Sequence, residues 1–173
     1  MIQSNIVPEC YVDTKVAEIV GQAKKYNHQH GCGDVANEFR GRLNNIAALG
    51  IIDEDANKGP SAEYFTDFSV VKQENNLILK KHHQKQHYLI LVCPEIEKWL
   101  METAQNVNIS PLDYGLPHQL KGFIKITKIK DIDRNEDFKR FIKHLIRENA
   151  PGIITLKKWI ELFNINQFHT LDN

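Results

Sequence analysis

The chain has 173 residues with 22 basic and 22 acidic side chains, so its formal net charge at pH 7 is zero. This balance excludes an overall electrostatic field that draws the molecule to nucleic acid or to a membrane surface, and any such contact needs a local basic patch. With 42% hydrophobic and 25% charged residues the composition is that of an ordinary globular domain, and no apolar run approaches the roughly 20 residues of a membrane helix.

The first 108 residues alternate between predicted strands and helices. Thr14 and Asp34 are placed to cap two helices, and Asn75-Asn76 is a turn signal between two alternating runs. In chain order we expect a strand at 5–10, helices at 15–26 and 35–46, a strand at 47–52, a hairpin at 68–82, a strand at 87–95 and a helix at 96–108. This order predicts an α/β fold with a mostly parallel sheet flanked by helices.

The composition changes after residue 112. Residues 113–122 have the character of a linker, and apolar stripes then predict helices at 135–149 and 150–164. These stripes are too few to bury a core of their own. We therefore predict an α/β core over 1–112 and a C-terminal helical appendage over 113–173 that packs on it.

The cysteines and the N-terminal stretch indicate a compartment. Cys10, Cys32 and Cys93 are odd in number and lack the spacing of a disulfide framework. The stretch MIQSNIVPECY lacks the basic start and long apolar segment of a signal peptide. We expect reduced thiols, a cytoplasmic location and no membrane association.

Acidic residues follow three of the predicted strands. Ligand sites in open α/β sheets lie beyond the carboxyl ends of the strands, so side chains at these ends are candidates for one site. They are Glu9, Asp53, Asp55, Glu95 and Glu97. Mg²⁺ and Mn²⁺ prefer carboxylate oxygens, which makes a divalent metal site the functional interpretation. The alternative, which a lone D-x-D pattern favours, is a solvated acidic turn.

The order of these residues resembles the toprim family over residues 5–108. In that family a strand ends in E-G-x-x-D before a helix, and a D-x-D follows a later strand. This chain has E-C-Y-V-D from Glu9 to Asp13, then Asp53 and Asp55, and its PEIEKWL segment supplies a further acidic residue. Two departures stand out: Cys10 replaces the glycine, and the glycine after the D-x-D comes one residue late.

The resemblance implies roles for these residues. Glu9 is similar to the family's general acid/base or metal-binding glutamate, and Asp53 and Asp55 to its metal ligands, with Glu95 or Glu97 completing the site. It implies a small stand-alone toprim-like protein related to OLD-type nucleases, with Mg²⁺- or Mn²⁺-dependent phosphodiester chemistry on DNA or RNA and an ATPase partner in a defence system. The alternative is a non-catalytic toprim-like interaction module.

Basic residues and histidines offer further candidates for substrate binding. Lys58 is a candidate phosphate contact or simply an exposed loop lysine, and Lys80 and Lys81 begin the basic run KKHHQKQH, a candidate nucleic-acid contact or a solvated hairpin end. His28 and His30 lie in a glycine-rich turn that can face the acidic site. Zinc binding there is disfavoured, because no C-x-x-C or H-x-x-x-H pair lies nearby.

Overall fold

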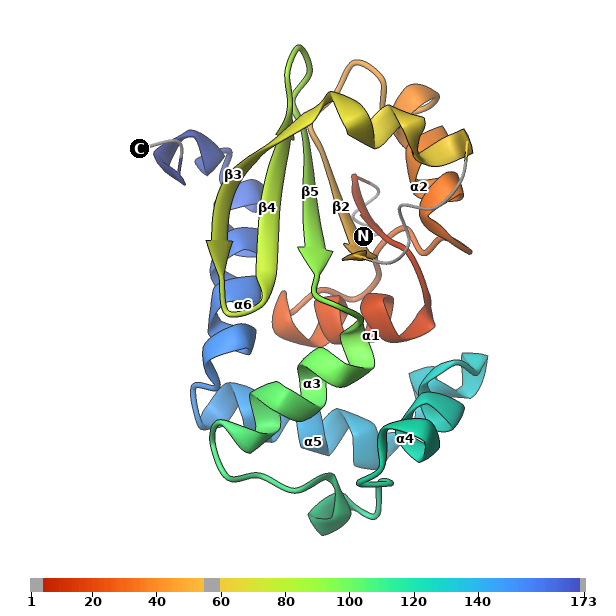
Figure 1. Ribbon diagram of the computed structural model, residues 1–173, viewed down its shortest axis with the longest axis vertical. Coiled ribbons are helices and arrows are strands. Elements are labelled where there is room, and N and C mark those ends of the chain that lie inside the picture. Colours follow the sequence, from red (N-terminus) through yellow and green to blue (C-terminus); the bar gives the residue numbers. More distant parts are fainter. Residues whose placement is uncertain (1–4, 55–59, 172–173) are drawn as a thin grey trace.

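The computed structural model describes residues 5–54 and 60–171, and five strands in this part form one sheet. The strands are β1 (Ile6–Pro8), β2 (Ala48–Asp53), β3 (Phe68–Glu74), β4 (Leu77–His82) and β5 (His87–Val92). Their order across the sheet is β1-β2-β5-β4-β3. β1, β2 and β5 are parallel, whereas β4 and β3 form an antiparallel extension (Figure 1). The α/β class with a mixed sheet is therefore confirmed.

The described residues form six α-helices, which cover the faces of the sheet and the end at which β2 and β5 finish (Figure 1). They are α1 (Tyr11–Val20), α2 (Cys32–Arg40), α3 (Ile96–Gln105), α4 (Leu120–Thr127), α5 (Glu136–Arg147) and α6 (Pro151–Asn164). Short 3₁₀ segments cover Pro60–Asp67, Pro111–Tyr114, Lys130–Arg134 and Phe168–Leu171. In Figure 1, α1 and α3 lie just beyond the arrowheads of β2 and β5, and α2 lies beside β2.

The sheet has a hydrophobic core on each face. Leu49 and Ile51 of β2 belong to the cluster that contains α1, α3, α5 and α6, whereas Ala48 and Ile52 belong to the cluster with α2 and Phe65. Alternate residues of a strand point to opposite faces, so both sets must be apolar when both faces are covered. This is why β2 reads as an unbroken apolar run.

The predicted hairpin is confirmed. β3 and β4 pair in antiparallel fashion and turn at Asn75 and Asn76, whose φ angles are 52° and 57°. Asparagine tolerates this left-handed conformation better than other residues with a Cβ, and two successive residues of positive φ match the twist of a tight hairpin.

Two predicted caps are wrong. α1 begins at Tyr11 with Cys10 as its N-cap, and Thr14 lies inside the helix, where its hydroxyl donates to the Cys10 carbonyl oxygen at 2.7 Å. α2 begins at Cys32 after Gly31, and Asp34 belongs to its first turn. Gly31 has a φ of 146°, which a residue with a Cβ rarely adopts, so the glycine sets the start of this helix.

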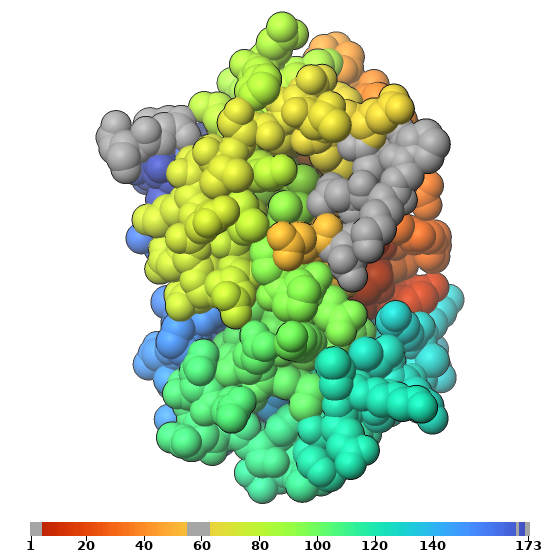
Figure 2. Space-filling view, in the orientation of Figure 1, coloured from red at the N-terminus to blue at the C-terminus, as the bar shows by residue number. Residues whose placement is uncertain are grey.

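The C-terminal helices pack on the same core as the sheet. Phe141 and Leu145 of α5 and Trp159 of α6 share one buried cluster with Val16 of α1 and Trp99 of α3. Segments coloured cyan and green lie directly against one another in Figure 2. The segment 113–122, expected to be a linker, includes the start of α4, which the sequence did not predict. No helix in the described part of the chain is long and apolar enough to cross a membrane.

Candidate functional site

The carboxyl ends of the three parallel strands bring acidic residues together. Glu9 directly follows β1, Asp53 ends β2, and Glu95 follows β5 by three residues. Because β1 pairs with β2 and β2 with β5 in parallel register, the carboxyl ends of these three strands lie next to one another at the same end of the sheet. α1 and α3 begin at this end, and the N-terminal ends of helices favour nearby negative charge. Chain topology thus concentrates carboxylates here.

Glu9 and Asp53 are in direct contact. The Glu9 Oε2 atom accepts a hydrogen bond of 3.1 Å from the Asp53 backbone N–H. The Asp53 Oδ1 atom in turn accepts one of 2.8 Å from the backbone N–H of Ile96, the first residue of α3. Each carboxylate therefore satisfies a backbone donor at the end of a strand or the start of a helix.

Burial and mutual repulsion alter the acidity of this pair. Burial, followed by the charge of Glu9, raises the pKa of Asp53 to about 7, although the Ile96 hydrogen bond opposes the shift. Burial also raises the pKa of Glu9, against the lowering effect of the Asp53 and Cys32 backbone N–H groups. At neutral pH the Asp53 side chain is therefore divided between its protonated and its ionised form.

Asp13 is the most unusual group at this end of the sheet. It lies in the first turn of α1 with only 1% of its surface exposed, and neither carboxylate oxygen has a hydrogen-bond partner among the described residues. Burial first, and then the charge of Asp53, raises its pKa well above the usual value. An unpaired buried carboxylate costs several kcal/mol, so this group is either protonated or neutralised by a cation.

The two glutamates of the α3 segment have different environments. Glu97 is buried at 2% exposure, and its Oε1 atom accepts a hydrogen bond of 2.7 Å from the Thr127 hydroxyl at the end of α4. Glu95 is half-buried and is the N-cap residue of α3. Both nevertheless line the pocket described next.

A pocket of ≈ 280 Å³ opens over these carboxylates. Its lining comes from four parts of the chain: Glu9, Cys10, Tyr11, Asp53, Glu95, Glu97, Thr127 and Lys128. Lys128 supplies the basic group of this lining. Thr127 and Lys128 are not predicted from the sequence, because the stretch in which α4 begins has the character of a linker. Cys10 is no nucleophile here, because burial and the neighbouring Asp13 charge raise the pKa of its thiol.

The histidines lie behind the acidic pocket. His28 stacks on Tyr11 at a centroid distance of 4.3 Å, and its Nδ1 atom is 3.0 Å from the Thr14 hydroxyl oxygen. His30 packs edge-on to His28 at 4.8 Å. Neither ring lines the pocket, whereas Tyr11, on which His28 stacks, does. Burial, followed by the charge of His30, lowers the pKa of His28 and favours its neutral form.

The structure separates the predicted lysines from the acidic pocket. Lys81 pairs with Tyr88 and Lys80 with Leu89 near the start of β5, whereas Asp53 pairs with Val92 at its end. Lys80 and Lys81 therefore lie at the end of the sheet opposite to the acidic pocket. The predicted residues Asp55 and Lys58 lie outside the described residues.

The donor set fits a hard divalent cation, although the described side chains form no complete ligand group. Carboxylate oxygens are what Mg²⁺ and Mn²⁺ prefer, and neither Asp13 oxygen has a hydrogen-bond partner of normal geometry among the described residues, although the nearby Cys10 thiol lowers the pKa of Asp13. Within residues 5–54 and 60–171, however, no three His, Cys, Asp or Glu side chains are arranged to hold a metal ion.

Comparisons with family models, curated proteins and solved structures find no match to this chain. The candidate site is therefore defined by its own geometry.

Proposed function

We propose that this chain is a toprim-like protein whose acidic pocket binds Mg²⁺ or Mn²⁺ and carries out phosphodiester chemistry on DNA or RNA. The observation that carries the proposal is Asp13, a buried carboxylate without a hydrogen-bond partner among the described residues, next to Glu9 and Asp53. A bound divalent cation removes the cost of these adjacent charges. It also supplies Lewis-acid stabilisation of phosphate charge and an activated water.

Each residue of the pocket has a distinct part in this proposal. Glu9 and Asp53 hold the cation, as the resemblance implies, and the charge of Asp13 supports it from the interior. Lys128 lines the same pocket and attracts a phosphate group as a point charge. Asp53 with a pKa of about 7 loses its proton readily when the cation binds.

The topology supports the toprim-like part of the proposal. A glutamate after the first strand, a helix directly after it and an acidic end of the adjacent parallel strand occur in the expected order. Cys10 replaces the glycine of the motif, and its φ of −138° and ψ of 178° are extended values that any residue adopts. The departure at Cys10 therefore leaves the local backbone intact. An ATPase partner remains part of the proposal through the resemblance alone.

The second candidate is a non-catalytic interaction module. It is favoured because three carboxylates already accept hydrogen bonds with structural roles: Glu9 from Asp53, Asp53 from Ile96, and Glu97 from Thr127. A cluster that serves only to join strand and helix ends needs no cation.

Metal-dependent activity separates the two functions. Labelled single-stranded DNA, double-stranded DNA and RNA are incubated with the protein and Mg²⁺ or Mn²⁺, with EDTA as control. We expect cleavage that EDTA and Asp53→Asn both abolish. An absence of cleavage together with an unchanged melting temperature in Mg²⁺ and Mn²⁺ favours the interaction module.

A further inference from the structure

A row of lysines runs along α4 and ends at the acidic pocket. Lys121, Lys125 and Lys128 follow one another at intervals of four and three residues, so they share one face of the helix. All three are exposed, and α4 contains no acidic residue. Lys128 is the C-cap residue of α4 and lines the pocket. We call these three residues the lysine stripe. It lies outside residues 5–108, to which the toprim resemblance extends.

The opposite face of α4 is buried. Phe123 and Thr127 are fully buried, and Phe123 belongs to the core cluster that also contains residues of α3 and α5. Figure 1 shows α4 close to α3, and Figure 2 shows the cyan segment around α4 at the surface. A helix that lies on a membrane needs a free apolar face to insert. Because the apolar face of α4 packs on the protein, the stripe is suited to a polyanion in water.

The lysine stripe lacks acidic partners. Within residues 5–54 and 60–171, no hydrogen bond or ion pair engages the side chain of Lys121, Lys125 or Lys128. Like charges four residues apart on a helix repel, so Lys121 and Lys125 destabilise α4 slightly without a counter-charge. An anion that lies along the stripe removes this repulsion.

The segment after the stripe does not neutralise it. The 3₁₀ segment Lys130–Arg134 contains Asp131 and Asp133, and Asp133 is paired with Lys15 of α1 at 3.1 Å. The charges of Lys130 and Arg134 offset those of the two aspartates. The three charges of the stripe therefore remain as a local positive excess in a chain whose net charge is zero.

The basic residues of α5 are, by contrast, neutralised on their own helix or next to it. The Lys139 Nζ atom lies 2.7 Å from the Glu136 Oε1 atom, and the Arg147 Nε atom lies 3.2 Å from the Glu148 Oε1 atom. Their charges are therefore less available to an added anion than those of the stripe.

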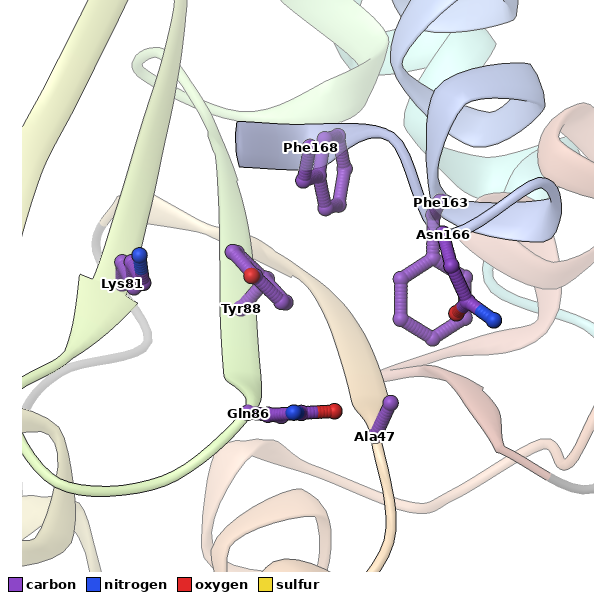
Figure 3. Close-up of a pocket in the computed structure, with 7 residues that line it drawn as sticks. All are labelled: Ala47, Lys81, Gln86, Tyr88, Phe163, Asn166 and Phe168. Carbon is purple, nitrogen blue, oxygen red and sulfur yellow. The ribbon is translucent and has the colours of Figure 1, made fainter. Parts of the chain in front are cut away.

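The basic run at the opposite end of the sheet is also engaged. The Lys85 Nζ atom donates a hydrogen bond of 3.3 Å to the Asn44 carbonyl oxygen. The Lys81 Nζ atom lies 6.0 Å from the centroid of the Tyr88 ring, and Figure 3 shows both residues at a pocket of ≈ 420 Å³. The rings of this pocket pack on one another, with the Tyr88 and Phe168 centroids 4.6 Å apart. The lysine stripe is therefore the more accessible surface for an anion.

We propose that the phosphodiester backbone of a nucleic-acid strand lies along the lysine stripe and places one phosphate in the acidic pocket at Lys128. This inference rests on the proposed function and deepens it, because the stripe favours a polymer over a small phosphodiester. An α-helix rises about 1.5 Å per residue, so the stripe is about 10 Å long. The phosphates of one DNA strand rise about 3.4 Å each, so this length covers three to four of them.

A binding titration in EDTA measures the stripe without metal and without cleavage. The probes are fluorescein-labelled strands of about 20 nucleotides, one of deoxythymidylate and one of deoxyadenylate, observed by fluorescence anisotropy. We expect a Kd of about 100 μM or tighter in about 50 mM salt, with similar values for both strands, because phosphate contacts carry no base information. Three phosphate contacts predict about 20-fold weaker binding in about 200 mM salt.

Variants locate the binding on the stripe. Lys121→Gln and Lys125→Gln each remove one charge from an exposed position, so both should fold as the wild type does. Each should weaken binding of both strands about fivefold and reduce the salt dependence by about one phosphate contact. Lys157→Gln on α6 removes the same charge from a lysine that lies 3.8 Å from Glu161, and it should bind as the wild type does.

Other anionic partners are tested by competition. Polyglutamate and vesicles of phosphatidylserine are added at the same concentration of negative charge as the labelled strand, and we expect neither to displace it. Displacement by either overturns the proposal in favour of an acidic protein segment or a membrane surface. The proposal is also overturned if neither strand binds at several hundred micromolar. Equal affinity of the wild type and of folded Lys121→Gln and Lys125→Gln, verified by circular dichroism, overturns it as well.

The cleavage assay separates this inference from the proposed function. In Mg²⁺ or Mn²⁺, Lys121→Gln and Lys125→Gln should act mainly on KM for the strand, because neither residue lines the acidic pocket. Binding that depends on the stripe, without cleavage in either metal, refutes the phosphodiester chemistry and keeps the stripe. Cleavage with the same KM in the wild type and in both variants refutes the stripe and keeps the chemistry.

Discussion

The Glu9 carboxylate accepts a hydrogen bond from the backbone N–H of Asp53, which lies 44 residues further along the chain. This bond joins the ends of two adjacent parallel strands through a side chain whose own charge repels the Asp53 carboxylate. The contact therefore combines a structural hydrogen bond with an electrostatic cost. Substitutions that keep the hydrogen bond but remove the charge repulsion therefore measure the two effects separately.

Glu9→Gln is expected to keep the contact and remove the charge. The amide oxygen of glutamine still accepts from the Asp53 N–H, so the variant should be at least as stable as the wild type without metal. Its melting temperature should not rise with added Mg²⁺ or Mn²⁺, whereas the wild type gains about 2.7 kcal/mol when the ion is at 100 times its Kd. Thermal melts with and without metal measure both. Glu161→Gln, an exposed change on α6, is the control and should respond to metal as the wild type does.

Asp53 allows a matched pair of substitutions. Asp53→Asn keeps an oxygen that accepts from the Ile96 N–H, whereas Asp53→Ala removes it and leaves the first turn of α3 uncapped. Loss of such a cap costs about 0.5–2 kcal/mol, so the alanine variant should be the less stable of the two in urea unfolding. Asp53→Asn combined with Asp55→Asn should match or exceed wild-type stability and gain nothing from metal. A destabilised double variant with a wild-type metal response contradicts the metal site.

The contribution of Asp53 to the stability of the wild type should fall as pH rises through the range in which Asp53 titrates. Its pKa is raised from the usual 3.8 to about 7, so between these values the folded protein binds a proton that the unfolded chain does not. The Asp53 contribution to the free energy of unfolding therefore decreases from about pH 4 to about pH 7 and changes little above it. Asp53→Asn should show a smaller decrease, because Glu9 and Asp13, whose pKa values are also raised, are still present.

Histidines require that the two proteins be compared at each pH. Burial lowers the pKa of His82 and His87, which removes stability as pH falls through the histidine range in wild type and variant alike. The difference between the two unfolding free energies cancels this shared effect. A difference independent of pH from 4 to 8 would show that Asp53 titrates as an ordinary exposed carboxylate.

The pairing of Glu9 with Asp53 was predictable from the sequence because strand ends and parallel order suffice to place both. Asp13 was not. Its burial depends on where α1 begins, and the sequence favoured Thr14 as the cap, which left Asp13 outside the helix. Because α1 begins at Tyr11, Asp13 falls in its first turn, where it is buried next to Glu9 and Asp53.

The part of the acidic pocket that α4 and the residue after it supply, Thr127 and Lys128, could not be predicted from the sequence either. Pro117 and Gly122 gave the segment the character of a linker, and both have structural reasons within the fold. A Cβ on Gly122 would lie 2.9 Å from the Pro117 Cβ, so the glycine permits α4 to pack closely on the segment before it. Such tertiary contacts, which place Thr127 and Lys128 at the pocket, leave no periodic pattern.

The predicted division at residue 112 leads to a test by truncation. A fragment of residues 1–112 loses α5 and α6 and exposes the faces of Val16 and Trp99 that contact them. Exposed apolar surface of this extent favours association, so the fragment should aggregate or lack a cooperative thermal transition. Size-exclusion chromatography and calorimetry measure both properties. A monomeric fragment with a sharp transition would show that the tail is dispensable for folding.

Gly152 should be intolerant of alanine although alanine is the better helix former. A Cβ at this position in α6 would lie 2.8 Å from the Thr103 Oγ1 atom and 2.9 Å from the Trp99 Cζ2 atom. The Trp99 ring cannot shift freely, because its Nε1 donates a hydrogen bond of 3.0 Å to the Asn75 carbonyl oxygen. Overpacking costs about 1–3 kcal/mol, against a helix-propensity gain of at most about 1 kcal/mol, so Gly152→Ala should be destabilising in urea unfolding. Trp99→Phe removes the indole atoms that clash, so the double variant should lose less stability than the sum of the single losses. Strictly additive losses would show that α6 adjusts its position on α3 without strain.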